Sequence, residues 1–279
     1  MKTMLHRLSV LTLAVLPLTL SAQWPGYPTP AVPRTPTGAP NLNAPAPRTA
    51  SGQTDLSGIW RNTQPARLTE FGVPAPPRDP AAPPTGLDLF RDVSAGLKDG
   101  LPLQPWAADL KKQRMADFSK GNPDAHCLPM GNMQFHTHPQ PRKIVQTPQL
   151  IVILYEGNAG LRQVFLDGRP LPNNDPQPWW YGYSMGKWDG DTLVVETIGF
   201  RDDGWLDING SPLTGAGKMT ERFRRVNYGN LEVQITVDDP KAYTKPWTVT
   251  VNQLIVLNAE MIEFVCAENE KDVPHLVSK

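Results

Sequence analysis

The stretch GKWDGDTLVVETIGF, residues 186–200, decides the fold class of this chain. Its central pair, Asp189-Gly190, is a strong signal for a tight β-hairpin turn. The segments that flank the pair, YGYSMGKW before it and DTLVVETIGF after it, are therefore predicted to be two antiparallel strands.

Further strands are predicted on both sides of this hairpin. Order begins at TDLSGIWRN, residues 54–62, and Tyr228-Gly229 and Asn258-Ala259 are expected turns later in the chain. The other predicted strands are KIVQTPQLIVILYE, LRQVFLDG, KMTERFRRV, LEVQITV, PWTVTVNQLIVLN and EMIEFVCAEN. Eight or nine strands in sequential order predict an all-β antiparallel meander of about eight strands. Closure into a barrel is favoured because it removes exposed strand edges.

One helix is predicted at residues 105–119, within the otherwise irregular region before the strands. Pro105 suits a first helical turn and Gly121 suits a stop. Its apolar side chains are expected to share a face that packs on the sheet, namely Trp106, Leu110, Met115 and Phe118.

The N-terminal residues 1–22 have the pattern of a secretory signal peptide. Lys2 and Arg7 precede an apolar run of residues 8–20, which is too short to span a bilayer comfortably. We expect cleavage before Gln23 and a periplasmic or secreted protein with no membrane span after cleavage. An uncleaved membrane anchor is the alternative.

Residues 23–53 are rich in Pro, Thr, Ala and Asn and have no hydrophobic periodicity. They are predicted to be a disordered linker. The alternative is an arm that wraps the domain in polyproline form, with Trp24 and Tyr27 docked on it. A single β-barrel domain is then expected at residues 54–279.

The charge balance argues against nucleic-acid binding. The 279 residues include 27 Lys+Arg and 27 Asp+Glu, so the net charge is zero and no basic surface is indicated. The 31 prolines resist long helices and favour strands joined by turns.

Two cysteines, Cys127 and Cys266, are present. An even number in an exported chain predicts one disulfide, worth up to about 5 kcal/mol in the chain-entropy model. Two buried free thiols are the alternative.

A resemblance extends this interpretation. The opening Gly58-x-Trp60 resembles the first strand of the lipocalin or calycin superfamily. The segments KIVQTP, FLDGRPLP, GKWDGDTLVVETIGF, TERFRR and VDDPKAYTKPWTVTV resemble a large family of exported, largely uncharacterised bacterial proteins. The resemblance covers about residues 54–279 and implies a calycin-like barrel. Leu213 and Lys218 stand where members of that family often have histidines, so a metal site built on those histidines is not expected here.

The segment FHTHPQP, residues 135–141, raises the question of a divalent metal site. On a strand, His136 and His138 would point to the same face and could reach one cation. His126 or His275 would have to supply a third ligand, although neither has a recognised spacing. Exposed loop histidines are the alternative, and no cofactor is otherwise indicated.

Charged residues within apolar strands are candidates for a polar patch inside the barrel. If Val226 pairs with Leu231, Arg222 and Arg224 share the apolar face, where charges need partners or a water-filled cavity. The alternative is an outward face with solvated ion pairs.

Aromatic residues cluster in WWYGY, residues 179–183, which is expected at the barrel mouth, whereas Trp60 and Trp188 are assigned to the core. The candidate ligand-binding residues are therefore Arg222, Arg224, Glu196, Tyr155, Trp179, Trp180, Tyr181 and Tyr183.

No nucleophile elbow, phosphate loop, zinc-protease motif or dinucleotide fingerprint is present. The favoured hypothesis is an exported barrel that binds a small apolar or aromatic molecule. An enzyme such as a lyase, isomerase or hydrolase is the alternative, with Glu156 or Asp167 as acid/base and Arg162 holding an anion. A structural module of the cell envelope is the third. The sequence leaves the ligand and the oligomeric state open.

Overall fold

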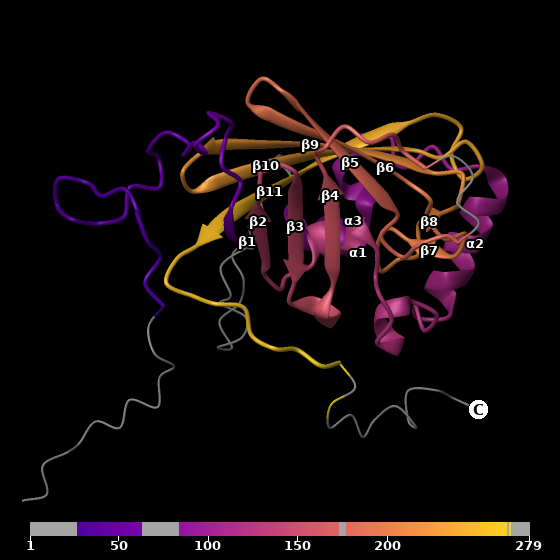
Figure 1. Ribbon diagram of the computed structural model, residues 1–279. Helices are drawn as coiled ribbons and strands as arrows, with labels where there is room; N and C mark the ends of the chain where they lie inside the picture. The colour runs from indigo at the N-terminus through magenta and orange to yellow at the C-terminus, as the bar shows by residue number, and fades with distance from the viewer. Residues whose placement is uncertain (1–26, 63–83, 173–176, 267, 269–279) are drawn as a thin grey trace, which may run out of the picture.

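The computed structural model describes residues 27–62, 84–172, 177–266 and 268. Its central strands are β1 (Gly58–Asn62), β2 (Arg142–Gln146), β3 (Leu150–Tyr155), β4 (Leu161–Phe165), β5 (Tyr183–Asp189), β6 (Thr192–Ile198), β9 (Lys218–Asn227), β10 (Asn230–Asp238) and β11 (Trp247–Val256). In the described residues these form a closed barrel in the order β1-β11-β10-β9-β6-β5-β4-β3-β2 (Figure 1). A separate two-stranded sheet pairs β7 (Gly204–Trp205) with β8 (Pro212–Leu213). The predicted all-β barrel is confirmed.

One junction of the barrel departs from the antiparallel meander. Strands β4 and β5 are parallel and pair only at Val164–Ser184 and Phe165–Met185, whereas every other neighbouring pair in the described barrel is antiparallel. A parallel pair needs a long crossover, and residues 166–182 separate the two strands in the sequence.

Two strand predictions are wrong in detail. KIVQTPQLIVILYE is two strands, β2 and β3, because the chain turns at residues 147–149, where the Thr147 side chain bonds the backbone of Leu150 in both directions. The described residues of EMIEFVCAEN form no strand, and β11 is the last one. The hairpins at Asp189-Gly190 and Tyr228-Gly229 are confirmed by the β5–β6 and β9–β10 pairings, although the two turn residues of the first are Gly190 and Asp191, because Asp189 pairs with Thr192.

The register of β9 against β10 differs from the prediction by one residue. Leu231 pairs with Arg225 rather than with Val226, because the register shifts at Asn230/Leu231. A shift of one position moves every side chain of a strand to the opposite face. Arg222 and Arg224 therefore point outward, and Glu221 points into the barrel together with its apolar neighbours on β9.

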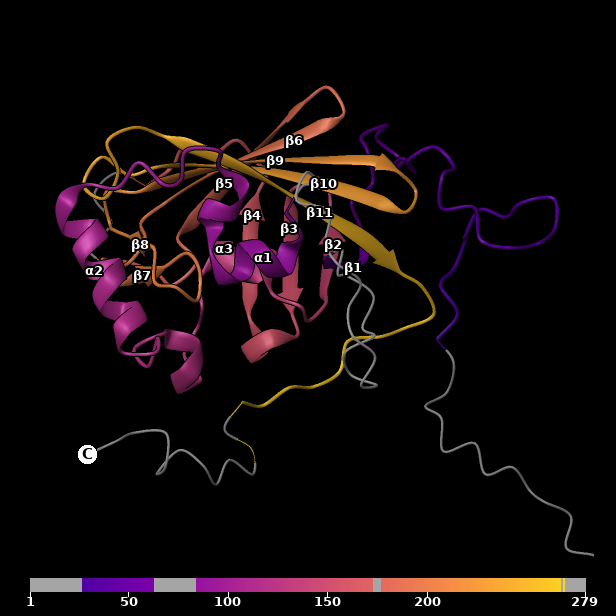
Figure 2. The same cartoon turned by 180° about the vertical axis from the view of Figure 1, so that it is seen from behind.

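The barrel interior is largely filled by apolar side chains. Trp60 is fully buried, as predicted, and its Nε1 donates to the backbone oxygen of Leu56 at 3.0 Å. The short helices α1 (Gly86–Arg91) and α3 (Asn132–Thr137) lie in front of β3 and β4 when the molecule is viewed from behind (Figure 2). All six residues of α3 are buried, so this helix contributes to the core.

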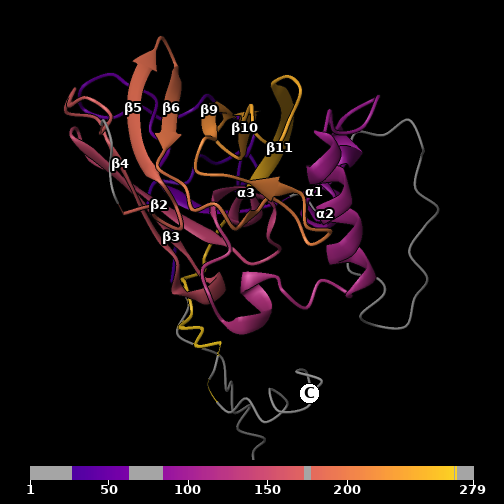
Figure 3. The ribbon, with the colours of Figure 1, turned by 90° about the vertical axis from the view of Figure 1, so that its right-hand side faces the viewer.

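The predicted packing helix is observed as α2 (Pro105–Ala116), but most of the apolar side chains expected on its packing face are exposed. Trp106 is 46% exposed, Met115 48% and Phe118 88%, and Ala107 alone is buried in this helix. Helix α2 lies at the edge of the molecule (Figure 3), where it contacts β8. The helices that add apolar side chains to the core of the strands are α1 and α3, and neither is predicted from the sequence.

Residues 27–53 are ordered, which corrects the prediction of a disordered arm. The backbone oxygens of Leu42 and Ala44 accept hydrogen bonds at 2.8 Å from Gly229 and Tyr228 in the β9–β10 turn. Arg48 forms an ion pair with Asp191 at 2.7 Å. The arm is therefore attached to two hairpin turns, although not as a polyproline helix throughout. Trp24 and the signal segment 1–22 lie outside the described residues.

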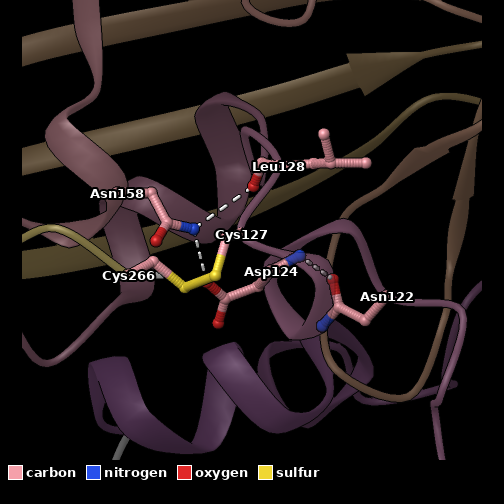
Figure 4. Close-up of a disulfide and its surroundings, with 6 residues drawn as sticks. All are labelled: Asn122, Asp124, Cys127, Leu128, Asn158 and Cys266. Carbon is pink, nitrogen blue, oxygen red and sulfur yellow. Dashed lines mark hydrogen bonds between the residues drawn. A yellow bond between two sulfur atoms is a disulfide. The ribbon is translucent and has the colours of Figure 1, made fainter. Parts of the chain in front are cut away.

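The predicted disulfide is confirmed, with Cα atoms of Cys127 and Cys266 5.4 Å apart (Figure 4). It fastens the chain beyond β11 to the loop that precedes α3. Beside it, Asn158 donates to Asp124 at 2.7 Å and to the Leu128 backbone oxygen at 3.2 Å. No helix in the described part of the chain is long and apolar enough to cross a membrane.

Candidate functional site

A layer of polar side chains crosses one level of the barrel interior. Successive strands each contribute to it, and the helix α3 adds a histidine. All its members are at most 4% exposed, which is unusual for such polar groups. We call this set the inner polar layer: Arg142, Tyr155, Arg162, Ser184, Thr197, Glu221 and His136.

Glu221 is the centre of the inner polar layer. Its Oε1 is 2.5 Å from His136 Nε2 and accepts from Arg162 Nη1 at 2.8 Å, and its Oε2 accepts from Arg162 Nη2. The Arg162 guanidinium also donates to Ser184 Oγ at 3.0 Å and to Thr197 Oγ1 at 2.9 Å. This carboxylate and its guanidinium thus satisfy each other in the absence of bulk water.

The charges in the layer follow from these contacts. Burial alone would raise the pKa of Glu221, but the charge and hydrogen bonds of Arg162 lower it to about 2. Burial lowers the pKa of His136, and this outweighs the opposing effect of Glu221. His136 is therefore neutral at pH 7, with its Nε2 proton directed at Glu221 and its Nδ1 available as an acceptor.

Arg142 has a different environment. Its guanidinium donates to neutral acceptors, the backbone oxygen of His136 at 2.6 Å and Asn62 Oδ1 at 3.2 Å among them. Burial lowers its pKa to about 10. Directly across from it on β3 is Tyr155. Tyr155 Oη, Arg142 Nε and His136 Nδ1 are buried without a hydrogen-bond partner in the described structure.

A groove opens at the junction where β4 and β5 diverge. Its volume is about 410 Å³, within the range of small-molecule sites. Rings stand close together along it, with Tyr183 5.2 Å from both Phe165 and Trp179 between ring centroids. We call it the seam groove, lined by Leu161, Arg162, Gln163, Phe165, Trp179, Trp180, Tyr181, Gly182, Tyr183 and Ser184.

The seam groove and the inner polar layer share two residues. Arg162 and Ser184 belong to both. Tyr181 provides a second connection, because its ring is 5.5 Å from Phe135, which stacks on Tyr155 at 4.1 Å. Burial first, and the neighbouring Tyr155 second, raise the pKa of Tyr181. The groove therefore leads from exposed aromatic rings to the buried charges.

The structure brings part of the predicted ligand site together. The four WWYGY aromatics, Trp179 to Tyr183, all line the seam groove at the start of β5. Tyr155 lies inside the barrel next to Arg162. Trp188 is half-buried against the core.

The other predicted ligand residues lie on the outer surface. Arg222 pairs with Asp189 at 2.9 Å, Arg224 pairs with Glu232 at 3.0 Å, and Glu196 pairs with Lys218. Their expected position inside the barrel is wrong, because the register shift turns the β9 arginines outward. The solvated ion pairs considered as the alternative are what the structure contains.

The proposed acid/base carboxylates also lie apart from the groove. Asp167 is at the surface with Arg169. Glu156 follows β3, and its Oε2 accepts from the backbone of Ile262. Of the residues predicted for an enzyme, Arg162 alone lies in the seam groove.

The two histidines of FHTHPQP do not share a face. His136 is within α3 and His138 ends it, so residues two apart point in different directions. His138 packs edge-on against Phe90 at 4.9 Å, and burial and then Arg142 lower its pKa to about 4. In the described residues no group of three or more His, Cys, Asp or Glu could hold a metal ion. The strand geometry on which the metal hypothesis depended is therefore wrong.

Four members of the inner polar layer are not among the residues predicted from the sequence, namely Glu221, Arg142, Ser184 and Thr197. Glu221 had a detectable signal, because it alternates with Met219 and Phe223 on β9, where period two places all three on one face. Arg142 had none, since its burial depends on α3 covering the end of β2.

Neither a protein-family model nor a curated protein matches the chain. Its function must therefore be inferred from the geometry of the site.

Proposed function

We propose that this protein is an exported binding protein that holds a small planar aromatic molecule in the seam groove. The observation that carries the proposal is the row of aromatic rings, Phe165, Tyr183 and Trp179, that lines a groove of about 410 Å³. Aromatic side chains favour offset or edge-on contacts with other rings, and each such contact adds about 0.5–1.5 kcal/mol to simple burial.

Export is supported by two features. The N-terminal segment 1–22 has the pattern of a signal peptide, and the Cys127–Cys266 disulfide is typical of an oxidising compartment. We therefore propose a periplasmic or secreted location. We also propose a calycin-like relationship, which agrees with the barrel and with Gly58-x-Trp60 on its first strand.

The test is a calorimetric titration with 2-naphthamide, a neutral planar probe. We expect saturable one-to-one binding that Trp179→Ala weakens about tenfold, as expected for the loss of one stacked ring. Trp106→Ala is the matched control, because Trp106 is similarly exposed on α2 and does not line the groove. Absence of binding by both 2-naphthamide and 2-naphthoate would remove the proposal.

An acid–base enzyme is the second candidate. The observation that favours it is the His136–Glu221 pair, in which Nε2 is held and Nδ1 has no partner, as in a general base oriented by a carboxylate. We would follow deuterium exchange into the methyl group of 2-acetylnaphthalene by NMR. Catalysed exchange that His136→Gln abolishes supports an enzyme, and exchange no faster than in buffer excludes this activity.

A further inference from the structure

The buried charges beside the seam groove do not balance. The inner polar layer contains two guanidinium groups, Arg142 and Arg162, and one carboxylate, Glu221. Glu221 forms its ion pair with Arg162. In the described part of the chain Arg142 is bonded to neutral oxygens and forms no ion pair, so one positive charge remains uncompensated.

An uncompensated buried guanidinium is costly, because its hydration is lost without an opposite charge in return. The carbonyl oxygens around Arg142 recover part of this cost, but its Nε is buried without a partner. An anion near this position would supply both the missing charge and the missing acceptor.

A second unpartnered donor lies next to Arg142. Tyr155 is its cross-strand neighbour on the inner face, and the Tyr155 hydroxyl is fully enclosed without a hydrogen bond of ordinary geometry. The charge of Arg162 acts on the same hydroxyl from β4. The Glu221 carboxylate acts on this hydroxyl too, but Glu221 is already paired with Arg162, so the charge left without a partner beside the hydroxyl is that of Arg142.

Tyr155 does not line the seam groove itself, but it lies next to residues that do. Tyr181 and Arg162 both line the groove, and each interacts with Tyr155. A ligand that places its ring against Trp179 and Tyr183 would direct a substituent toward Tyr155.

We propose that the ligand of the seam groove is an aromatic carboxylic acid, whose carboxylate accepts from the Tyr155 hydroxyl between Arg142 and Arg162. This inference rests on the proposed function and specifies the ligand class for the same groove. A neutral aromatic ligand would leave the charge of Arg142 uncompensated. We therefore favour an acid over a neutral ligand.

The experiment compares two probes of the same shape, 2-naphthoate and its neutral counterpart 2-naphthamide, by calorimetry at pH 7. We expect 2-naphthoate to bind about tenfold more tightly, the effect of one hydrogen bond to a charged group. Tyr155→Phe should remove this preference and leave the affinity for 2-naphthamide unchanged. Tyr27→Phe, a change on the exposed arm, should leave both affinities unchanged.

The outcomes separate the two proposals. If both probes bind equally, the groove binds aromatics and the carboxylate inference is overturned. If 2-naphthoate is preferred but Tyr155→Phe retains the preference, the carboxylate does not lie at Tyr155 and the inference is likewise overturned. If neither probe binds, the proposed function fails and the inference fails with it.

Discussion

The β9–β10 hairpin and the β4–β5 junction are two parts of one barrel wall built in different ways. In the hairpin, nine residue pairs join the strands along their whole length. At the junction, two pairs join strands that run parallel. The long ladder seals the wall, and the short one leaves the seam groove, with Arg162 and Ser184 at its inner side. The long connection between β4 and β5 thus leaves an opening in the wall, whereas the tight turn between β9 and β10 keeps those two strands paired.

The largest expected effect comes from the inward face of β9. Replacing Glu221 by Leu removes the partner of buried Arg162, and we expect a loss of about 3–5 kcal/mol in the free energy of unfolding. The adjacent Arg222 is the matched control, because its ion pair with Asp189 is solvent-exposed, and Arg222→Leu should cost less than about 1 kcal/mol. Urea denaturation measures both values. Equal losses would contradict the assignment of the two faces.

Acid should weaken the helix α3 that covers the interior. A histidine whose pKa is lowered in the folded state binds its proton more readily when unfolded, so stability falls as pH drops below the unfolded pKa of about 6.5. For His138, whose folded pKa is about 4, the free energy of unfolding should fall by about 3 kcal/mol between about pH 6.5 and pH 4. His136 adds a loss in the same direction.

Urea denaturation at several pH values tests this expectation. The variant His138→Phe keeps the ring against Phe90 and should show a smaller decrease between about pH 6.5 and pH 4. Glu221, whose pKa is about 2, loses its contribution to stability only below its unfolded value of about 4.5, so it does not act over most of this pH range. An unchanged decrease in the free energy of unfolding would show that groups other than His138 cause the acid sensitivity.

The same substitution can be compared at two glycines, Gly182 beside the seam groove and Gly190 in a hairpin turn. Gly182 has φ +64°, and a Cβ there would meet Ile198 O at 2.7 Å and Thr197 Cγ2 at 2.6 Å. Gly190 has φ +58° in open space. We expect Gly182→Ala to cost about 2–3 kcal/mol and to weaken binding of 2-naphthamide, whereas Gly190→Ala costs about 1 kcal/mol from backbone strain alone. Urea denaturation measures the free energy of unfolding, and calorimetry measures the binding of 2-naphthamide. Equal losses of stability in the two variants, with unchanged binding, would show that Gly182 merely occupies a turn.

The smallest expected effect is at Tyr155. Because its hydroxyl has no hydrogen bond of ordinary geometry, Tyr155→Phe should leave the free energy of unfolding unchanged or raise it by up to about 1 kcal/mol. A decrease of more than about 1 kcal/mol in urea denaturation would show that the hydroxyl is bonded in the ligand-free protein, and would weaken the case for an anion there.

Features with a local signal follow from the sequence, whereas features set by a tertiary contact do not. Asp189-Gly190 specifies its hairpin because a two-residue turn needs positive φ, which Gly190 supplies. The WWYGY segment pointed to the groove because four aromatic rings lie within five residues of one another, and all four line it. The register of β9 was wrong by one residue, since a bulge at Asn230/Leu231 is invisible in the alternation of either strand.

The sequence by itself determined the all-β class, the hairpin turns, the one long helix and the pairing of the two cysteines, because each depends on residue type or spacing along the chain. Only the tertiary structure decided that β4 and β5 run parallel, that α3 covers the barrel interior, and that Arg142, Tyr155 and Glu221 lie close together. The physical reason is that a polar side chain is tolerated in an interior only through partners from other strands, and those partners are chosen by closure of the barrel.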